Sequence, residues 1–115
     1  MIIKKNIGQV GKWIFNDGSQ PFQVRAIHSH EIGNQEHLHK TMIEYFYVVR
    51  GTMIISINGQ PVHMREDDLV VVEPGEPHVV TEKSPDLFLF LIMPPPVPGD
   101  KEDVHPQNLS YMSKS

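Results

Sequence analysis

Hydrophobic residues in this chain occur in short runs that end at glycine, proline or polar residues. Helical spacing of apolar residues is nearly absent, and ten prolines and eight glycines interrupt the sequence. The runs between these interruptions are rich in β-branched and aromatic residues, which is typical of strands in an all-β protein. The pattern predicts strands at residues 12–15, 22–30, 36–39, 43–50, 52–57, 61–65, 69–73, 78–81 and 87–93.

The segments between these strands are too short to hold crossover helices. Asn58-Gly59 lies between two β-rich runs and is the strongest hairpin signal in the sequence. Parallel strands need long connections, whereas antiparallel strands can be joined by tight turns. We therefore predict an all-β fold, either a closed antiparallel barrel or a two-sheet jelly roll.

The character of the chain changes at Pro94. The sequence P-P-P-V-P-G-D cannot form a helix or an inner strand, and the residues after it are mostly polar. We divide the chain into a β-barrel domain at residues 1–93, with its core at 22–93, and a proline-rich C-terminal extension at 94–115. We expect the extension to pack on its own barrel or on a partner subunit.

Length and charge exclude several classes of protein. A chain of 115 residues suits one domain. A net charge of -4 with scattered lysines and arginines argues against nucleic-acid binding. The longest apolar run, residues 87–93, is far shorter than the roughly 20 residues of a membrane span. The N-terminus lacks the apolar segment of a signal peptide, and cysteine is absent, so we expect a cytoplasmic protein without disulfides.

Candidate chemistry is concentrated in one stretch that contains His37, His39 and Glu44. Side chains alternate along a strand, so His37 and His39 project from the same face, about 7 Å apart. Glu44 is an odd number of residues from both, and a straight strand would turn it to the opposite face. It can join the histidines only if the chain reverses, and we place this reversal at residues 40–42. Glu44 would then lie on the next strand, with His37 and His39 beside it.

A fourth candidate ligand, His78, follows a P-G-E-P turn far along the chain. Because cysteine is absent, any metal must be bound by nitrogen and oxygen atoms. Three imidazoles and a carboxylate suit Fe, Mn, Ni, Zn, Co or Cu, and do not suit Ca, which prefers oxygen ligands. We predict one divalent transition metal ion per chain, with two positions open on a six-coordinate ion.

At these residues the sequence resembles the cupin superfamily. The first motif of that family is G(X)5HXH(X)3-4E(X)6G. In this chain it is matched by His37, His39, Glu44 and Gly51. Gly33 lies three residues before His37 instead of five, which is a small departure within a loop.

The second cupin motif, G(X)5PXG(X)2H(X)3N, is matched at Gly75 and His78. Asp67 stands at the usual glycine, Glu73 at the usual first proline and Glu82 at the usual asparagine. These departures concern the geometry of the turns and leave the four ligand positions intact.

The resemblance spans roughly residues 22–93 and implies a small single-domain cupin with a double-stranded β-helix, or jelly-roll barrel. It also implies the metal ligands His37, His39, Glu44 and His78. Similar cupins are Fe-type dioxygenases, or isomerases, epimerases and lyases that use the ion as a Lewis acid. We therefore expect a metalloenzyme acting on a small polar or anionic molecule. The alternative is a non-catalytic module that binds or senses a sugar or an organic acid.

The sequence identifies no catalytic base, but it offers candidates for the wall of a pocket. These candidates are His28, His30, Phe46, Val48 and Phe90. His28 and His30 form a second H-X-H pair without a following glutamate, so a solvent-exposed strand face is the competing interpretation. Arg25 inside the barrel would suggest an anionic substrate, but we favour a surface position for it.

Residues 69–72 and 87–93 are apolar on successive positions, so both faces of these strands need cover. One face fills the barrel. Small cupins often dimerise, and a homodimer would cover the other face. Tyr45 and Tyr47 should face away from Glu44 and would suit such an interface.

Overall fold

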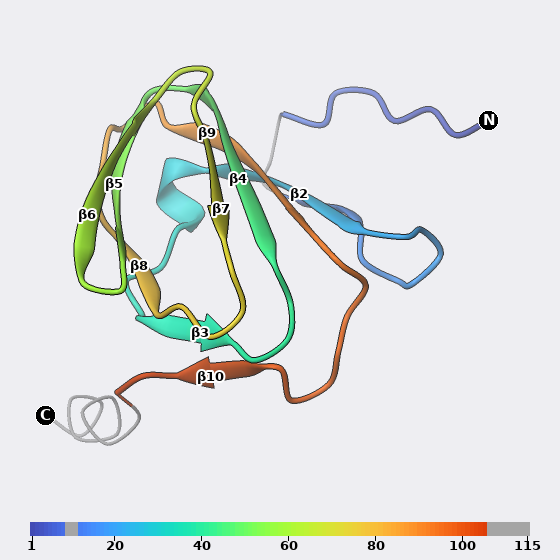
Figure 1. Cartoon of the computed structure of the whole chain (residues 1–115). Coiled ribbons are helices and arrows are strands. Elements are labelled where there is room, and N and C mark those ends of the chain that lie inside the picture. The colour runs from blue at the N-terminus through green and yellow to red at the C-terminus, as the bar shows by residue number, and fades with distance from the viewer. Residues whose placement is uncertain (9–11, 106–115) are drawn as a thin grey trace, which may run out of the picture.

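The computed structural model describes residues 1–8 and 12–105, and within these residues the chain forms ten β-strands and one short 3₁₀ helix (Figure 1). The elements are β1 (Lys12–Phe15), β2 (Gln23–His28), η1 (Ser29–Glu31), β3 (His37–His39), β4 (Glu44–Arg50), β5 (Thr52–Ile57), β6 (Gln60–Arg65), β7 (Leu69–Val72), β8 (His78–Lys83), β9 (Phe88–Met93) and β10 (Lys101–Asp103).

The strands form two five-stranded sheets. Their orders are β1-β2-β9-β4-β7 in the first sheet and β10-β3-β8-β5-β6 in the second. All of the strand pairings described are antiparallel. The predicted all-β fold, an antiparallel jelly-roll barrel, is therefore confirmed.

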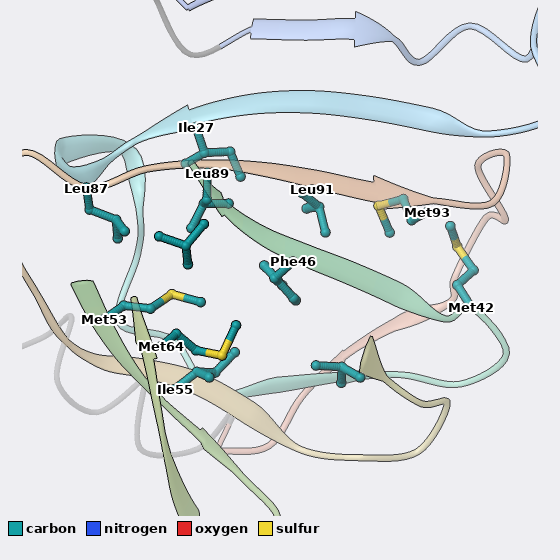
Figure 2. Packing of buried hydrophobic residues seen from close by; sticks show 12 residues of the cluster. Ile27, Met42, Phe46, Met53, Ile55, Met64, Leu87, Leu89, Leu91 and Met93 are labelled. Carbon is teal, nitrogen blue, oxygen red and sulfur yellow. The ribbon is translucent and has the colours of Figure 1, made fainter. Parts of the chain in front are cut away.

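The hydrophobic core lies between the two sheets. Figure 2 shows Leu89 and Leu91 of β9 pointing from the first sheet toward Met53 and Ile55 of β5 in the second. Full burial of one such side chain contributes about 1.5–3 kcal/mol. The core thus fixes the spacing of the two sheets, and with it the side chains that face each other between them.

Strand β4 shows the predicted alternation. Glu44, Phe46 and Val48 are buried, whereas Tyr45 is exposed and Tyr47 is half-buried on the other face. The buried glutamate therefore lies on the face that packs into the barrel, as the sequence predicted.

The predicted strand at residues 22–30 is too long, because β2 ends at His28 and the helix η1 follows. The Glu31 carboxylate accepts a hydrogen bond from the backbone N–H of His28 at 2.8 Å. The Ser29 hydroxyl donates to the backbone carbonyl of Ser84. These local hydrogen bonds compete with strand pairing and turn the chain away from the sheet.

The C-terminal extension begins by packing on its own barrel. Strand β10 runs antiparallel beside β3, as Figure 1 shows at the lower end of the molecule. Residues 106–115 lie outside the described part of the chain. Among residues 1–8 and 12–105, no helix is long and apolar enough to cross a membrane.

Candidate metal centre

The four predicted ligands come from both sheets. His37 and His39 lie on β3 and His78 lies on β8, and His37 pairs with His78 across these neighbouring strands. Glu44 begins β4 in the opposite sheet. Our expectation that the chain would place Glu44 on the strand next to the histidines was wrong. Residues 40–43 instead carry the chain from one sheet to the other, so Glu44 faces the histidines across the barrel.

The functional atoms of these residues lie close together. Nε2 of His78 is 2.8 Å from Oε1 of Glu44, and Nε2 of His39 is 3.3 Å from the same oxygen. One ligand atom from each of His37, Glu44 and His78 lies within 4.8 Å of the other two. His39 falls outside this tighter group, but it also contacts Glu44 directly.

Backbone carbonyls orient two of the imidazoles. Nδ1 of His37 lies 3.1 Å from the carbonyl oxygen of Gln35, and Nδ1 of His78 lies 2.9 Å from that of Glu76. A carbonyl oxygen can only accept a hydrogen bond, so each Nδ1 carries the proton. In a neutral imidazole with its proton on Nδ1, the free lone pair is on Nε2. In His78 this Nε2 atom faces Glu44.

The third imidazole is held by a carboxylate from the C-terminal extension. Oδ2 of Asp100 accepts a hydrogen bond from Nδ1 of His39 at 3.0 Å. Oδ1 accepts two more, from the backbone N–H and the hydroxyl of Thr41, at 2.7 and 2.6 Å. Asp100 is only 4% exposed. A buried carboxylate behind a histidine is the usual means of fixing a metal-binding imidazole.

The buried atoms of the site fit a cation. Oε1 of Glu44 and Nε2 of His78 are buried and have no hydrogen-bond partner, although they are 2.8 Å apart. With the proton of His78 on Nδ1, both atoms present lone pairs to each other and repel. A cation between them, either a proton or a metal ion, removes this repulsion. The donor set of imidazole nitrogens and one carboxylate therefore suits a divalent transition metal.

Burial and hydrogen bonding shift the pKa values of His37 and His78 in opposite directions. Burial lowers the pKa of His37, more than its hydrogen bond to Gln35 raises it. Burial also acts to lower the pKa of His78, but the contacts with Glu44 and the carbonyl of Glu76 outweigh it and raise the pKa overall. In the metal-free protein these shifts favour the neutral form of the His37 imidazole and the protonated form of the His78 imidazole.

The turn before β8 is fixed by its own hydrogen bonds. The Glu76 carboxylate accepts from the backbone N–H of Glu73 at 2.7 Å and from the side-chain amide of Asn58 at 2.8 Å. The backbone N–H of Gly75 donates to the carbonyl of His39 at 2.7 Å. The structure shows that Glu76 organises the turn that delivers His78.

All four candidate ligands line one cavity of about 390 Å³ between the sheets. Most of its other walls are apolar, and they include Ile27, Ile32, Phe46, Leu89, Leu91 and Met93. A larger hollow of about 750 Å³ lies over β5, β6 and β8 and contains none of the candidate ligands. We place the site in the smaller cavity, because the four candidate ligands converge there.

Of the predicted pocket residues, Phe46 lines this cavity and the other four do not. Val48 is directed inward but is completely buried in the core. Phe90 lies between Leu89 and Leu91, which line the cavity, so strand alternation turns it to the outer face of the sheet. His30 is exposed on η1.

His28 also lies on the outer face. Its ring stacks on Phe88 with 4.7 Å between centroids, and its Nε2 lies 2.6 Å from the carbonyl oxygen of Gly8. The pocket positions proposed for His28 and His30 are therefore corrected. Neither histidine of this H-X-H pair lines the cavity. The face of β2 that lines the cavity carries Arg25 and Ile27 instead.

Several residues of the site were missed in the sequence or placed at the surface. Arg25, Trp13 and Lys101 line the cavity, and Asp100 supports His39. The surface position favoured for Arg25 was wrong. Ala26 and Ile27 point to opposite faces of β2, and both are apolar. The alternation of side chains alone therefore did not decide which face of β2 is inside. No local sequence signal marks Asp100 or Lys101, because they depend on the long-range pairing of β10.

Sequence comparison gives a family and one curated relative. The sequence model of the family described as "Cupin domain" matches residues 24–94. The tetracenomycin polyketide synthase protein TcmJ of Streptomyces glaucescens is 28% identical over 61 residues. That alignment covers 51% of this chain and 41% of TcmJ, so the chain spans about two fifths of this relative's length.

Structural comparison finds the same fold in enzymes and in other proteins. Pac13 of Streptomyces, described as a nucleoside dehydratase, superposes with a TM-score of 0.65 at 17% identity, over 84% of this chain and 87% of Pac13. A protein from Planctomyces limnophilus superposes with a TM-score of 0.68 at 16% identity, over 88% and 96% of the two chains. At these identities the similarity shows the fold alone.

Proposed function

The chain belongs to the cupin family, and from this premise we propose that it is a metal-dependent enzyme acting on a small polar or anionic molecule. The observation that carries this proposal is the convergence of three imidazoles and the Glu44 carboxylate, from opposite sheets, in one cavity. Its volume of about 390 Å³ is within the range of small-molecule sites. The enzymatic descriptions of similar proteins, such as Pac13, add support.

Each ligand has a defined part in this proposal. The imidazoles of His37, His39 and His78 would bind one divalent transition metal ion through Nε2, and Glu44 would bind it through its carboxylate. A bound ion would supply Lewis acidity or, if it is iron, the activation of O₂. The chain supplies orientation through the acceptors at each Nδ1. The apolar wall around Phe46 lowers the local dielectric constant and strengthens every electrostatic contact in the cavity.

Two reaction classes are compatible with this ligand set. A dioxygenase needs only the metal and open positions for substrate and O₂. An isomerase, epimerase or lyase also needs a side chain that moves a proton. Apart from the four ligands, the ionisable residues on the cavity wall are Arg25, Glu31 and Lys101. The Glu31 carboxylate is already bonded to the backbone of His28, so Lys101 is the better candidate for proton transfer.

The alternative function is a non-catalytic module that binds a sugar or an organic acid. The scarcity of acid–base side chains on a mostly apolar cavity wall favours this alternative. In that case the cavity would bind its ligand without converting it.

We also propose a homodimer that covers the outer face of the first sheet. Leu69 and Val71 of β7 are 57% and 39% exposed, and the neighbouring Tyr45 of β4 is 37% exposed. Adjacent apolar side chains of this size favour burial against a second copy. Light scattering on the purified protein should give twice the mass of one chain, and a monodisperse monomer at micromolar concentration would contradict this proposal. Cytoplasmic location stays a prediction.

Metal analysis of the purified protein tests the proposed function. Protein isolated without added metal should carry about one divalent transition metal ion per chain. His78→Ala should lose this ion. His63→Ala is the matched control, because His63 is exposed on β6 and far from the ligands in the register of the sheet. Absence of metal from the wild-type protein, both as isolated and after incubation with each candidate ion, would contradict the metalloenzyme.

The identity of the bound ion and the measurement of O₂ uptake distinguish the reaction classes. Stoichiometric iron with O₂ uptake on added substrates supports the dioxygenase. Zinc, nickel, cobalt or manganese without O₂ uptake favours the Lewis-acid enzyme. Ligand binding that persists in His37→Ala, without any turnover in the wild-type protein, favours the binding module.

A further inference from the structure

Arg25 lies on the cavity wall without a carboxylate partner among the described residues. Its Nε is buried and has no hydrogen-bond partner. Among the described residues, no carboxylate oxygen lies within 4.0 Å of its guanidinium group. A buried guanidinium nitrogen without an acceptor is unfavourable by an amount comparable to a lost hydrogen bond to a charged group. The fold therefore holds Arg25 in a state that a ligand would stabilise.

Neighbouring strands hold this side chain in position. Arg25 on β2 pairs with Trp13 on β1 and with Leu91 on β9, and all three line the cavity. The guanidinium carbon lies 5.7 Å from the centroid of the Trp13 ring, within the range of a cation–π contact. Such a contact orients the guanidinium plane but leaves its N–H donors free for a ligand.

The acidic groups of the cavity are already occupied. Glu44 contacts His39 and His78, and the Glu31 carboxylate accepts the backbone N–H of His28. A second cation, Lys101 on β10, lines the same cavity. Two cationic side chains thus lack a carboxylate partner among the described residues, whereas both cavity carboxylates lie against groups other than these two cations.

We infer that this cavity binds a small carboxylate with an apolar body, and that Arg25 is the residue that recognises its carboxylate group. The planar guanidinium can bind a carboxylate through two parallel hydrogen bonds. The apolar body would contact Ile27, Phe46 and Leu91, and Lys101 adds positive potential. The inference deepens the proposed function and rests on it only for the claim that the bound molecule is a substrate.

The fluorescence of Trp13 measures ligand binding next to Arg25, because Trp13 contacts Arg25 and is the only tryptophan of the chain. Benzoate is the probe, and benzamide is its neutral counterpart of similar shape. The titrations use full-length protein stripped with a chelator and dialysed, and they are repeated after saturation with zinc. Benzoate should change the fluorescence saturably, with an affinity at least about tenfold higher than that of benzamide.

Variants then test the part of Arg25. Arg25→Gln should weaken benzoate binding by about tenfold or more and leave benzamide binding nearly unchanged. Arg25→Lys keeps the charge without the planar fork and should give an intermediate loss. Arg65→Gln is the matched control, because Arg65 is exposed on β6 and does not line this cavity. Its affinity for benzoate should equal that of the wild-type protein.

Several outcomes would overturn the inference. These are equal affinity for benzoate and benzamide in the wild-type protein, unchanged benzoate affinity in a folded Arg25→Gln variant, or tighter binding of inorganic phosphate than of benzoate. The comparison of benzoate with benzamide needs no variant and holds even if Arg25→Gln does not fold.

Failure of this inference can be distinguished from failure of the proposed function. If the protein binds no metal but still binds benzoate through Arg25, the carboxylate site stands and the metalloenzyme does not. If metal binds stoichiometrically and benzoate is not preferred, the metal centre stands and the carboxylate site does not.

Discussion

At the scale of single residues, Asp100 shows how the candidate metal centre is supported by a side chain outside the cupin motifs. Its carboxylate accepts hydrogen bonds from His39 and Thr41. Burial acts to raise its pKa, but these hydrogen bonds outweigh burial and lower it. Asp100 is therefore ionised at neutral pH, and it fixes the His39 proton on Nδ1 so that Nε2 stays available for a metal.

We predict that Asp100→Asn reduces metal affinity by about 10–100-fold. The amide keeps an oxygen for Thr41, but it cannot accept from His39 with its NH₂ group. Competition with a metal-binding dye measures the change, and circular dichroism checks the fold. Glu102→Gln on the adjacent strand β10 is the control. Glu102 is exposed, so this variant should bind metal like the wild-type protein. Equal affinity of Asp100→Asn and wild type would show that His39 needs no such support.

Asp67 shows how far a family motif predicts local geometry. It occupies the usual glycine position of the second motif and adopts a left-handed conformation, with φ of 70°. Its carboxylate accepts a hydrogen bond from the Tyr47 hydroxyl. Aspartate tolerates this conformation better than most residues with a side chain. Asp67 thus adopts the left-handed conformation that a glycine at this position of the motif would adopt easily.

At the scale of elements, the turn between β4 and β5 joins the two sheets at Gly51. Its φ is +83°, and a Cβ added there would lie 2.6 Å from Oγ of Ser84 and 2.7 Å from Cα of Leu87. Leu87 is buried, and the Ser84 hydroxyl oxygen accepts the backbone N–H of Thr52. Neither neighbour can retreat without disturbing the start of β9 or β5.

Gly51→Ala should therefore lower the free energy of unfolding by about 2–5 kcal/mol, from the left-handed φ and the steric overlap together. Gly59→Ala is the matched control. Gly59 has a φ of +77° in the β5–β6 turn, but an added Cβ would meet nothing within 4 Å. Gly59→Ala should lower the free energy of unfolding by only about 1–2 kcal/mol. Urea denaturation measures both values, and equal losses would show that the contacts at Gly51 relax freely.

Elements with a strong alternating pattern were predictable, and elements that depend on distant partners were not. The alternation in β4 gave the correct face for Glu44 and Phe46. The end of β2 was missed because the capping hydrogen bond of Glu31 is not visible as a hydrophobic pattern. Strand β10 was missed because its three residues are polar and follow a proline-rich segment. Only pairing with β3 makes them a strand.

At the scale of the whole molecule, the cavity brings together parts of the chain that no sequence motif connects. The motifs supplied the candidate ligands, since their spacing follows from the geometry of strands. Arg25 and Lys101 reach the same cavity from β2 and β10, at opposite ends of the chain. Their position depends on the order of strands within each sheet. The sequence predicted the fold class but not this order.

The protonation of the site links metal binding to stability across the molecule. Burial lowers the pKa of His37, so as pH falls below its ordinary value of 6.5 the unfolded chain takes up a proton first and stability decreases. His78 has the opposite sign. Burial acts to lower its pKa, but Glu44 raises it overall, so its contribution is complete below 6.5 and is lost as pH rises through the folded-state pKa. In the metal-free protein these two effects oppose each other near neutral pH.

Metal should change this balance, because a bound ion requires neutral imidazoles and competes with protons for their Nε2 atoms. The increase in melting temperature on adding saturating zinc should therefore be large at about pH 8 and should shrink toward about pH 5. Calorimetry of the metal-free and zinc-loaded protein across this range measures it. His63→Ala, which alters an exposed histidine, should give the same two curves. An increase that stays constant across the range would contradict binding through histidine, because protons would then not compete with the ion.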